Sequence, residues 1–153
     1  MSDSSARVDA KQLNAFIRRI LSTAGLCEAH ARIVADSITT AELFGFHSHG
    51  VIRIPHYIKR LRIGSLNGNP DIRVVQKKGN TAIVDGDHGM GHAVAFFAMQ
   101  EAVKLAESGI GFVGVRKSSH FGIAGYTAMQ ALQKDMIGIV VSHTDASVIP
   151  FGG

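Results

Sequence analysis

The spacing of apolar residues changes once along this 153-residue chain, at the turn-forming residues Gly68-Asn69-Pro70. Before this turn, apolar residues recur every three to four positions, which is the period of an amphipathic helix. After it, short apolar runs alternate with helical stretches, as is typical of α/β folds. The sequence therefore predicts an α/β protein in two parts: a helical segment over 1–68, followed by alternating strands and helices over 69–153.

Start and stop signals divide the first part into three helices. Asp9 can cap the first helix, Gln12 is its capping-box partner, and Gly25 ends it. Signals of the same kind predict a second helix over about 28–43, closed by Gly45, and a third from Pro55 to Gly64.

In the second part, apolar runs of strand length alternate with helical stretches. The last run, 137–141, is expected to be a buried strand because its apolar residues are continuous. The predicted strands are 72–75, 82–84, 110–115 and 137–141, and the predicted helices run from the glycine-rich residues 86–91 to Gly109 and from Gly122 to about Lys134.

Composition and charge exclude several classes of protein. The single cysteine, Cys27, cannot form an internal disulfide and fits a reducing compartment, so we expect a cytoplasmic protein. Residues 1–9 lack the apolar core of a signal peptide, and no apolar run approaches membrane-spanning length. The net charge of +4 suits small anions, but the basic pairs are scattered and no aromatic residues interleave with them, so we expect no nucleic-acid binding.

Ser48-His49-Gly50, followed by Arg53, is the first candidate site. Imidazole gains and loses a proton near neutral pH, and a neighbouring hydroxyl can orient the ring. A guanidinium can hold a carboxylate through two parallel hydrogen bonds. These residue types could bind an organic acid and transfer a proton beside it; the alternative is a polar loop that only satisfies two helix ends.

Two glycine-rich loops could approach a phosphate. Residues 119–125 lie between a predicted strand and a predicted helix, and residues 86–91 have a similar context. Neither loop reads as the dinucleotide-binding pattern with an acidic residue at the expected offset, which argues against a standard Rossmann fold. Ordinary tight connections are the alternative.

Histidine pairs raise the alternative of a metal-dependent enzyme. His47 and His49 alternate, and His88 and His92 lie four positions apart, so each pair could point one way. No nearby cysteine or carboxylate completes a recognisable ligand spacing, so the sequence favours no metal site.

Four blocks in order resemble the malate/L-lactate dehydrogenase family of the non-Rossmann type. The first block runs from Glu42 to Tyr57 and contains Ser-His-Gly, the arginine and Pro-x-Tyr in family register. The other three are Val84-Asp85-Gly86 with Gly89 and Gly91, Ser119-His120-Phe121-Gly122 with Gly125-Tyr126, and Val148-Ile149-Pro150-Phe151-Gly152-Gly153. The resemblance spans essentially the whole chain.

The resemblance implies hydride transfer between NAD or NADP and a small 2-keto or 2-hydroxy acid such as malate or lactate. In this assignment His49 is the acid/base, Ser48 assists it, and Arg53 binds the substrate carboxylate. The family's own cofactor-binding sheet and typical homodimer are implied as well. The residues implied to contact the cofactor are His120, Phe121, Gly122, Ile123 and Ala124.

The chain departs from the family pattern at three points. Ser119 stands where an asparagine is usual, and His143-Thr144 where Asn-Thr is common. The family also continues past the Pro-x-Gly-Gly block, with an acidic residue that pairs with the catalytic histidine. The fold is therefore expected to be incomplete and the 153-residue chain inactive alone; a non-catalytic partner chain of the same fold is the alternative.

Overall fold

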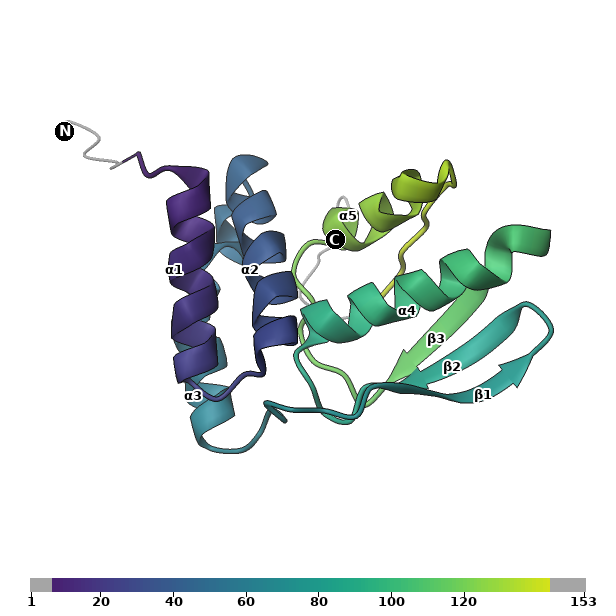
Figure 1. The fold of residues 1–153 in the computed structure, drawn as a ribbon, viewed down its shortest axis with the longest axis horizontal. Coiled ribbons are helices and arrows are strands. Elements are labelled where there is room, and N and C mark those ends of the chain that lie inside the picture. Colours follow the sequence, from purple (N-terminus) through teal and green to yellow (C-terminus); the bar gives the residue numbers. More distant parts are fainter. Residues whose placement is uncertain (1–6, 144–153) are drawn as a thin grey trace, which may run out of the picture.

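Residues 7–143 are described by a computed structural model, in which a group of helices stands beside an α/β unit (Figure 1). The helical part consists of α1 (Ala10–Thr23), α2 (Glu28–Leu43) and α3 (Ile54–Arg62). The fourth sequence block, Val148–Gly153, and Thr144 lie outside the described residues. The division at 68/69 remains a prediction, although α3 ends before it and the first strand begins after it.

The helix boundaries follow the predicted signals closely. Asp9 caps α1, because its side chain accepts a hydrogen bond of 3.0 Å from the Gln12 N–H. Gly25 follows the end of α1 with φ +100°, a backbone conformation that glycine adopts without strain. Helix α2 has the predicted bounds, and Pro55 lies in the first turn of α3. These four predictions are confirmed.

The helical part has its own apolar core. Side chains from α1, α2 and α3 meet there, and Met90 reaches the core from the α/β part, so the two parts pack against each other. Burial of such side chains contributes about 1.5–3 kcal/mol each to folding. The core residues with no exposed surface include Ile17, Leu21, Val34, Ile38 and Met90.

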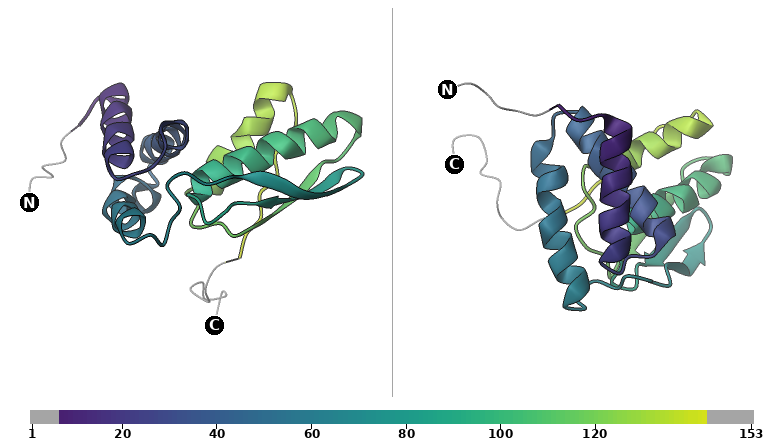
Figure 2. Two further views of the ribbon diagram at one scale, coloured as in Figure 1. Left: turned by 60° about the horizontal axis from the view of Figure 1, so that its bottom comes forward. Right: turned by 60° about the vertical axis from the view of Figure 1, so that its left-hand side comes forward.

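The α/β part is a three-stranded sheet in the order β1-β2-β3. β1 (Arg73–Lys78) and β2 (Thr81–Asp85) form an antiparallel hairpin, whereas β2 pairs in parallel with β3 (Phe112–Arg116). Helix α4 (Gly91–Leu105) makes the crossover that a parallel pair requires. It packs on one face of the sheet through Val84, Val94 and Ala98 (Figure 2, left). No helix in residues 7–143 is long and apolar enough to cross a membrane.

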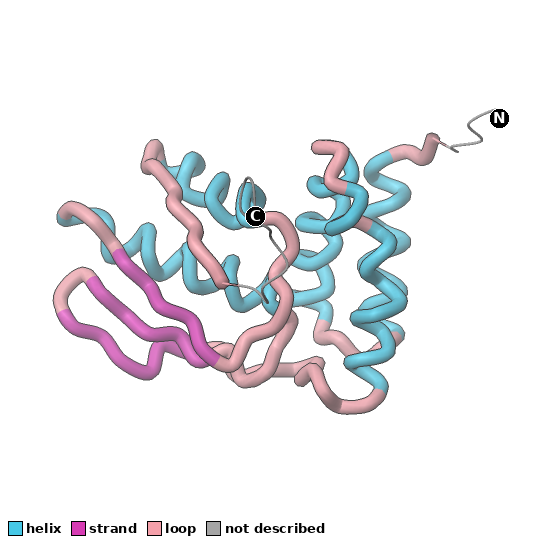
Figure 3. The backbone as a smooth tube through the Cα atoms, turned by 180° about the vertical axis from the view of Figure 1, so that it is seen from behind, coloured by secondary structure: helices cyan, strands magenta, loops and turns pink. Residues whose placement is uncertain are grey.

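The buried strand predicted over 137–141 is wrong. This segment has no strand pairing and is drawn as loop in Figure 3, and its Ile137, Ile139 and Val141 are 91%, 80% and 83% exposed. A strand needs a hydrogen-bonding neighbour, and none of the described residues pairs with this run. The helix predicted from Gly122 starts later, as α5 (Ala124–Ala128), and continues as the 3-10 helix η4 (Met129–Lys134), because Gly122 has φ +76°.

Asp85, at the end of β2, fixes the loops that follow β2 and β3. Its carboxylate accepts hydrogen bonds from the Asp87 N–H at 3.0 Å and from Arg116 Nε at 3.0 Å, and Lys117 Nζ lies 3.2 Å away. The Asp87 N–H, followed by these two cations, lowers the pKa of Asp85 to about 2. Because the folded pKa lies below the ordinary 3.8, the ionised carboxylate stabilises the fold above that pH and stops doing so as the pH falls towards 2.

We expect Asp85→Asn to lower the free energy of unfolding at neutral pH, because the amide carries no charge for Arg116 and Lys117. The difference from the wild type should shrink as the pH falls from about 4 to about 2, where Asp85 itself becomes neutral. Urea unfolding at a series of pH values measures this. Asp71→Asn is the control, since Asp71 is exposed and pairs only with Arg73 on the surface. A difference that stayed constant down to pH 2 would contradict the ionic role of Asp85.

Candidate active site

The loop between α2 and α3 carries the first group of predicted site residues. It consists of two 3-10 turns, η1 (His47–His49) and η2 (Val51–Arg53). The Ser48 hydroxyl lies 3.0 Å from His49 Nδ1, and Arg53 Nε donates a hydrogen bond of 2.7 Å to the Ser48 carbonyl oxygen. The structure therefore brings Ser48, His49 and Arg53 together on one loop, as predicted.

A second imidazole lies directly against this loop. The rings of His49 and His120 are stacked, with centroids 5.3 Å apart and an angle of 28° between their planes. Burial, followed by the charges of His49 and Arg53, lowers the pKa of His120. The sequence placed His120 only among the cofactor contacts, whereas the structure also makes it a neighbour of the proposed acid/base.

Tyr57, from α3, also contacts His120. Its hydroxyl lies 2.8 Å from His120 Nδ1, and the tyrosine itself is 1% exposed. Burial raises the pKa of Tyr57 to about 12, so the hydroxyl stays protonated at neutral pH. The Pro-x-Tyr pattern placed Tyr57 in a sequence block, but nothing in its spacing indicated a contact with His120.

His92, from the first turn of α4, is the third histidine of a group that we call the imidazole cluster: His49, His92 and His120. Its ring meets Tyr57 edge-on at 5.4 Å and His120 at 6.1 Å, and neither ring nitrogen has a hydrogen-bond partner in the described part of the chain. Burial, followed by the charges of His120 and His49, lowers the pKa of His92 to about 3. Burial therefore keeps the imidazole of His92 neutral at pH 7.

The metal alternative gains no support from the geometry. Residues 7–143 contain no group of three or more histidine, cysteine or acidic side chains that could hold a metal ion. The predicted pairs separate: His47 contacts Glu42, whereas His88 is exposed beside the loop after β2. Of these four histidines, His49 and His92 each lie against the ring of His120, and no carboxylate of the described residues joins them.

The two glycine-rich loops meet at Ser119. Its hydroxyl accepts a hydrogen bond of 2.9 Å from the Gly91 N–H and donates one of 3.1 Å to the Gly89 carbonyl. Among the predicted cofactor residues, His120 belongs to the imidazole cluster and Gly122 borders it, and Ile123 is buried against Ala41 and Tyr126. Phe121 is half-buried and Ala124 exposed, so these five residues do not share one environment.

Arg53 is exposed, and no carboxylate in residues 7–143 lies within ion-pair distance of it. Its Nε donates a hydrogen bond to the Ser48 carbonyl, which anchors the guanidinium to the loop. His56 and Arg60 also lie close enough to His120 to lower its pKa. The site therefore has a positive rim, which favours an anionic substrate.

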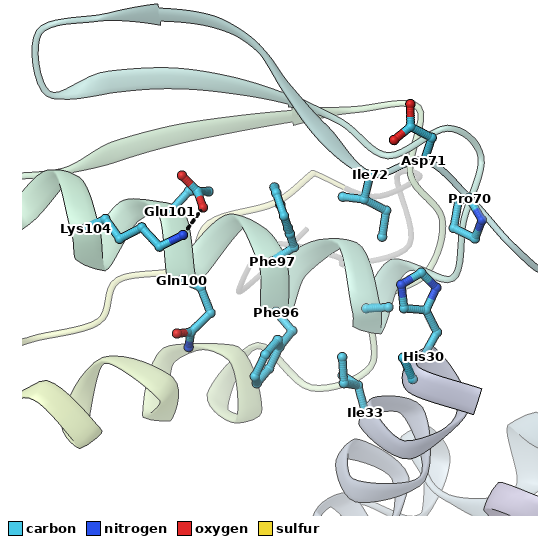
Figure 4. A pocket seen from close by; sticks show the side chains of 12 residues that line it. His30, Ile33, Pro70, Asp71, Ile72, Phe96, Phe97, Gln100, Glu101 and Lys104 are labelled. Atoms are coloured by element: carbon cyan, nitrogen blue, oxygen red, sulfur yellow. Dashed lines mark hydrogen bonds and ion pairs between the residues drawn. The ribbon is translucent and has the colours of Figure 1, made fainter. Parts of the chain in front are cut away.

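A cavity lies elsewhere, between α2, α4 and the segment that leads into β1 (Figure 4). It has a volume of about 420 Å³, with Phe96, Phe97 and Ile72 on its walls and His30 at one end. None of Ser48, His49, Arg53 or His120 lines it. This cavity is therefore separate from the group of residues around His49 and His120.

Comparison with known proteins identifies the family of this chain. A family model described as malate/L-lactate dehydrogenase matches residues 8–153. The L-sulfolactate dehydrogenase of Methanocaldococcus jannaschii is 44% identical over 135 residues, which are 88% of this chain and 39% of that protein. The malate dehydrogenase of Pyrococcus horikoshii is 42% identical over 148 residues, 96% of this chain and 41% of that protein. The chain thus spans well under half the length of these relatives.

Solved structures agree with the fold. The malate dehydrogenase of Pyrococcus horikoshii OT3 superposes with a TM-score of 0.83 at 40% identity, over 87% of this chain and 38% of the other. The sulfolactate dehydrogenase of Methanocaldococcus jannaschii gives 0.81 at 41% identity, over 84% and 38%. The predicted α/β fold and the resemblance stated from the four blocks are both confirmed.

Proposed function

Because the chain belongs to the malate/L-lactate dehydrogenase family, we propose that it provides the proton-transfer and carboxylate-binding part of an NAD(P)-dependent 2-hydroxyacid dehydrogenase. The observation that carries the proposal is the stacked pair His49–His120, with Arg53 on the same loop as His49 and no carboxylate of residues 7–143 within ion-pair distance of its guanidinium. Imidazoles exchange protons near neutral pH, and a guanidinium binds a carboxylate through two hydrogen bonds.

Reduction of a 2-oxo acid adds a hydride to the carbonyl carbon and a proton to the carbonyl oxygen, and oxidation reverses both transfers. A bound nicotinamide cofactor would supply or accept the hydride. His49 is our first assignment for the proton, because the Ser48 hydroxyl at its Nδ1 would orient the ring and leave Nε2 for the substrate. Arg53 would hold the substrate carboxylate and so set the angle of hydride attack.

His120 is the second imidazole that could carry the proton. It stacks on His49, and Tyr57 holds its Nδ1. Its lowered pKa keeps it neutral at pH 7, and a neutral imidazole can accept a proton when a hydroxy acid is oxidised. The variants His49→Ala and His120→Ala separate these two assignments.

Several finer assignments belong to the same proposal. The residues proposed to contact NAD or NADP are His120, Phe121, Gly122, Ile123 and Ala124; the buried Ile123 would do so through its backbone. One relative, from Escherichia coli, is named ureidoglycolate dehydrogenase (NAD(+)), which supports a nicotinamide cofactor. We propose malate or lactate and their 2-oxo acids as substrates, a homodimer as the assembly, and the cytoplasm as the location.

We expect the 153-residue chain alone to show no measurable turnover, because it spans about two fifths of its relatives. Joined to the remaining C-terminal part of the M. jannaschii sulfolactate dehydrogenase, it should oxidise NADH or NADPH with a 2-oxo acid. The loss of NADH or NADPH absorbance over time measures both activities. Turnover by the chain alone would contradict the first expectation, and a folded, inactive chimera with every 2-oxo acid tested would contradict the proposed function.

Exposed apolar side chains favour a second candidate, a non-catalytic partner chain. Phe112 on β3 is 62% exposed, and Ile137, Ile139 and Val141 are 91%, 80% and 83% exposed. Surfaces of this kind mark protein interfaces. Size-exclusion chromatography of the chain alone tests this candidate: a stable, defined oligomer favours it, whereas aggregation favours an incomplete dehydrogenase.

A further inference from the structure

We propose that Glu42 is a positioning residue that clamps the Ser48-His49-Gly50 turn from both of its ends. Its carboxylate reaches His47 before the turn and Val51 after it. The inference deepens the proposed function and rests on it for its catalytic consequence. The two contacts of Glu42 can be tested without measuring turnover.

Apart from Glu42, two side-chain contacts hold the loop: the bond from Arg53 Nε to the Ser48 carbonyl and the stacking of His49 on His120. The backbone hydrogen bonds of the loop are short-range turns, such as His49 N–H to the Phe46 carbonyl at 2.8 Å and Arg53 N–H to the Gly50 carbonyl at 3.1 Å. Gly50 is buried and has no side chain, and Ser48, Val51 and Ile52 are exposed, so burial of side chains contributes little to the position of the turn. A loop of this kind needs side-chain contacts from its supporting elements if it is to place an imidazole accurately.

Glu42 provides two such contacts from the last turn of α2. Its Oε1 accepts a hydrogen bond of 2.7 Å from the Val51 N–H, and its Oε2 lies 2.5 Å from His47 Nδ1. Hydrogen bonds to an ionised carboxylate are about twice as strong as neutral ones. The side chain of Glu42 is only 18% exposed, which limits competition from water.

Two further observations indicate that Glu42 stabilises the loop and not α2. A carboxylate at the C-terminal end of a helix is unfavourable, because the helix dipole is negative there, so Glu42 does not help α2. The missing side chain of Gly50 gives the carboxylate room, since a Cβ at that position would lie 1.9 Å from Glu42 Oε1. The glycine of the Ser-His-Gly motif and the glutamate therefore form one unit.

Amide hydrogen exchange at Val51 tests the clamp in the 153-residue chain itself. Glu42→Ala removes both contacts and should speed exchange at Val51 about tenfold to a hundredfold, as expected for loss of a hydrogen bond to a charged group. Glu42→Gln keeps an acceptor for the Val51 N–H and should give an intermediate rate. His47→Ala breaks only the other contact, at an exposed position where folding is not at risk.

Glu101→Gln is the matched control, because Glu101 is 19% exposed and pairs with Lys104 on α4, away from the loop. It should leave exchange at Val51 unchanged. In the chimera, Glu42→Ala should lower kcat at least tenfold and leave the KM for the cofactor unchanged, with partial rescue by Glu42→Gln. A purely structural role would lower stability without this separation of kcat from KM.

An unchanged exchange rate at Val51 in Glu42→Ala overturns the clamp, whatever the chimera does. An equal loss of protection in Glu101→Gln overturns it as well, because the effect would then be global. A chimera that reduces no 2-oxo acid, with Val51 still deprotected in Glu42→Ala, overturns the proposed function and supports the clamp.

Discussion

His49→Ala should lower kcat of the chimeric enzyme by about 10²- to 10⁴-fold, the usual contribution of a positioned general acid or base. The reason lies in the contacts of the ring: it stacks on His120, and the Ser48 hydroxyl lies 3.0 Å from its Nδ1, so the imidazole is held in one position. Steady-state NAD(P)H oxidation with a saturating 2-oxo acid measures the loss. Unchanged turnover would contradict the proposed role of His49.

His120→Ala separates the two imidazoles. If His49 carries the proton, the pH dependence of kcat should keep its shape in His120→Ala and lose one limb in His49→Ala. The reverse pattern would assign the proton to His120. His88→Asn is the control for loss of an imidazole, because His88 is exposed and its φ of +57° is one that asparagine tolerates. It should leave kcat unchanged.

The helices could be predicted because their signals act over a few residues. The Asp9 cap lies three positions from its donor, and Gly25 adopts its positive φ directly after α1. The run 137–141 shows the limit of such signals. Its residues favour a strand, but a strand forms only beside another strand, and no local pattern says whether that neighbour is present.

The candidate site shows the same difference between local signals and contacts made by packing. Ser48, His49 and Arg53 lie within one short loop, so their grouping followed from the sequence. Tyr57 and His92 could not be placed, because they reach His120 only through the packing of α3 and α4. Three-dimensional contacts between distant segments carry no period or spacing that a single sequence reveals.

Gly91→Ala should destabilise the protein by about 3 kcal/mol or more, the upper end of the cost of overpacking. A Cβ at this position would lie 2.1 Å from the Ser119 carbonyl oxygen and 2.5 Å from that of His120. Both are backbone atoms, which cannot rotate away as a side chain can. Relief would require α4 to move from the 119–120 turn, breaking the bond between the Gly91 N–H and the Ser119 hydroxyl.

Gly125→Ala is the matched control and should act in the opposite direction. Gly125 lies in α5 with no atom within 4 Å of its would-be Cβ, so alanine should stabilise the helix by about 0.5–1 kcal/mol. Urea unfolding followed by circular dichroism measures both variants. Because the 119–120 turn also carries His120, Gly91→Ala should remove the stacking on His49 even where the chain still folds. Equal unfolding midpoints for the two variants would show that α4 and this turn do not meet as closely as the backbone contacts require.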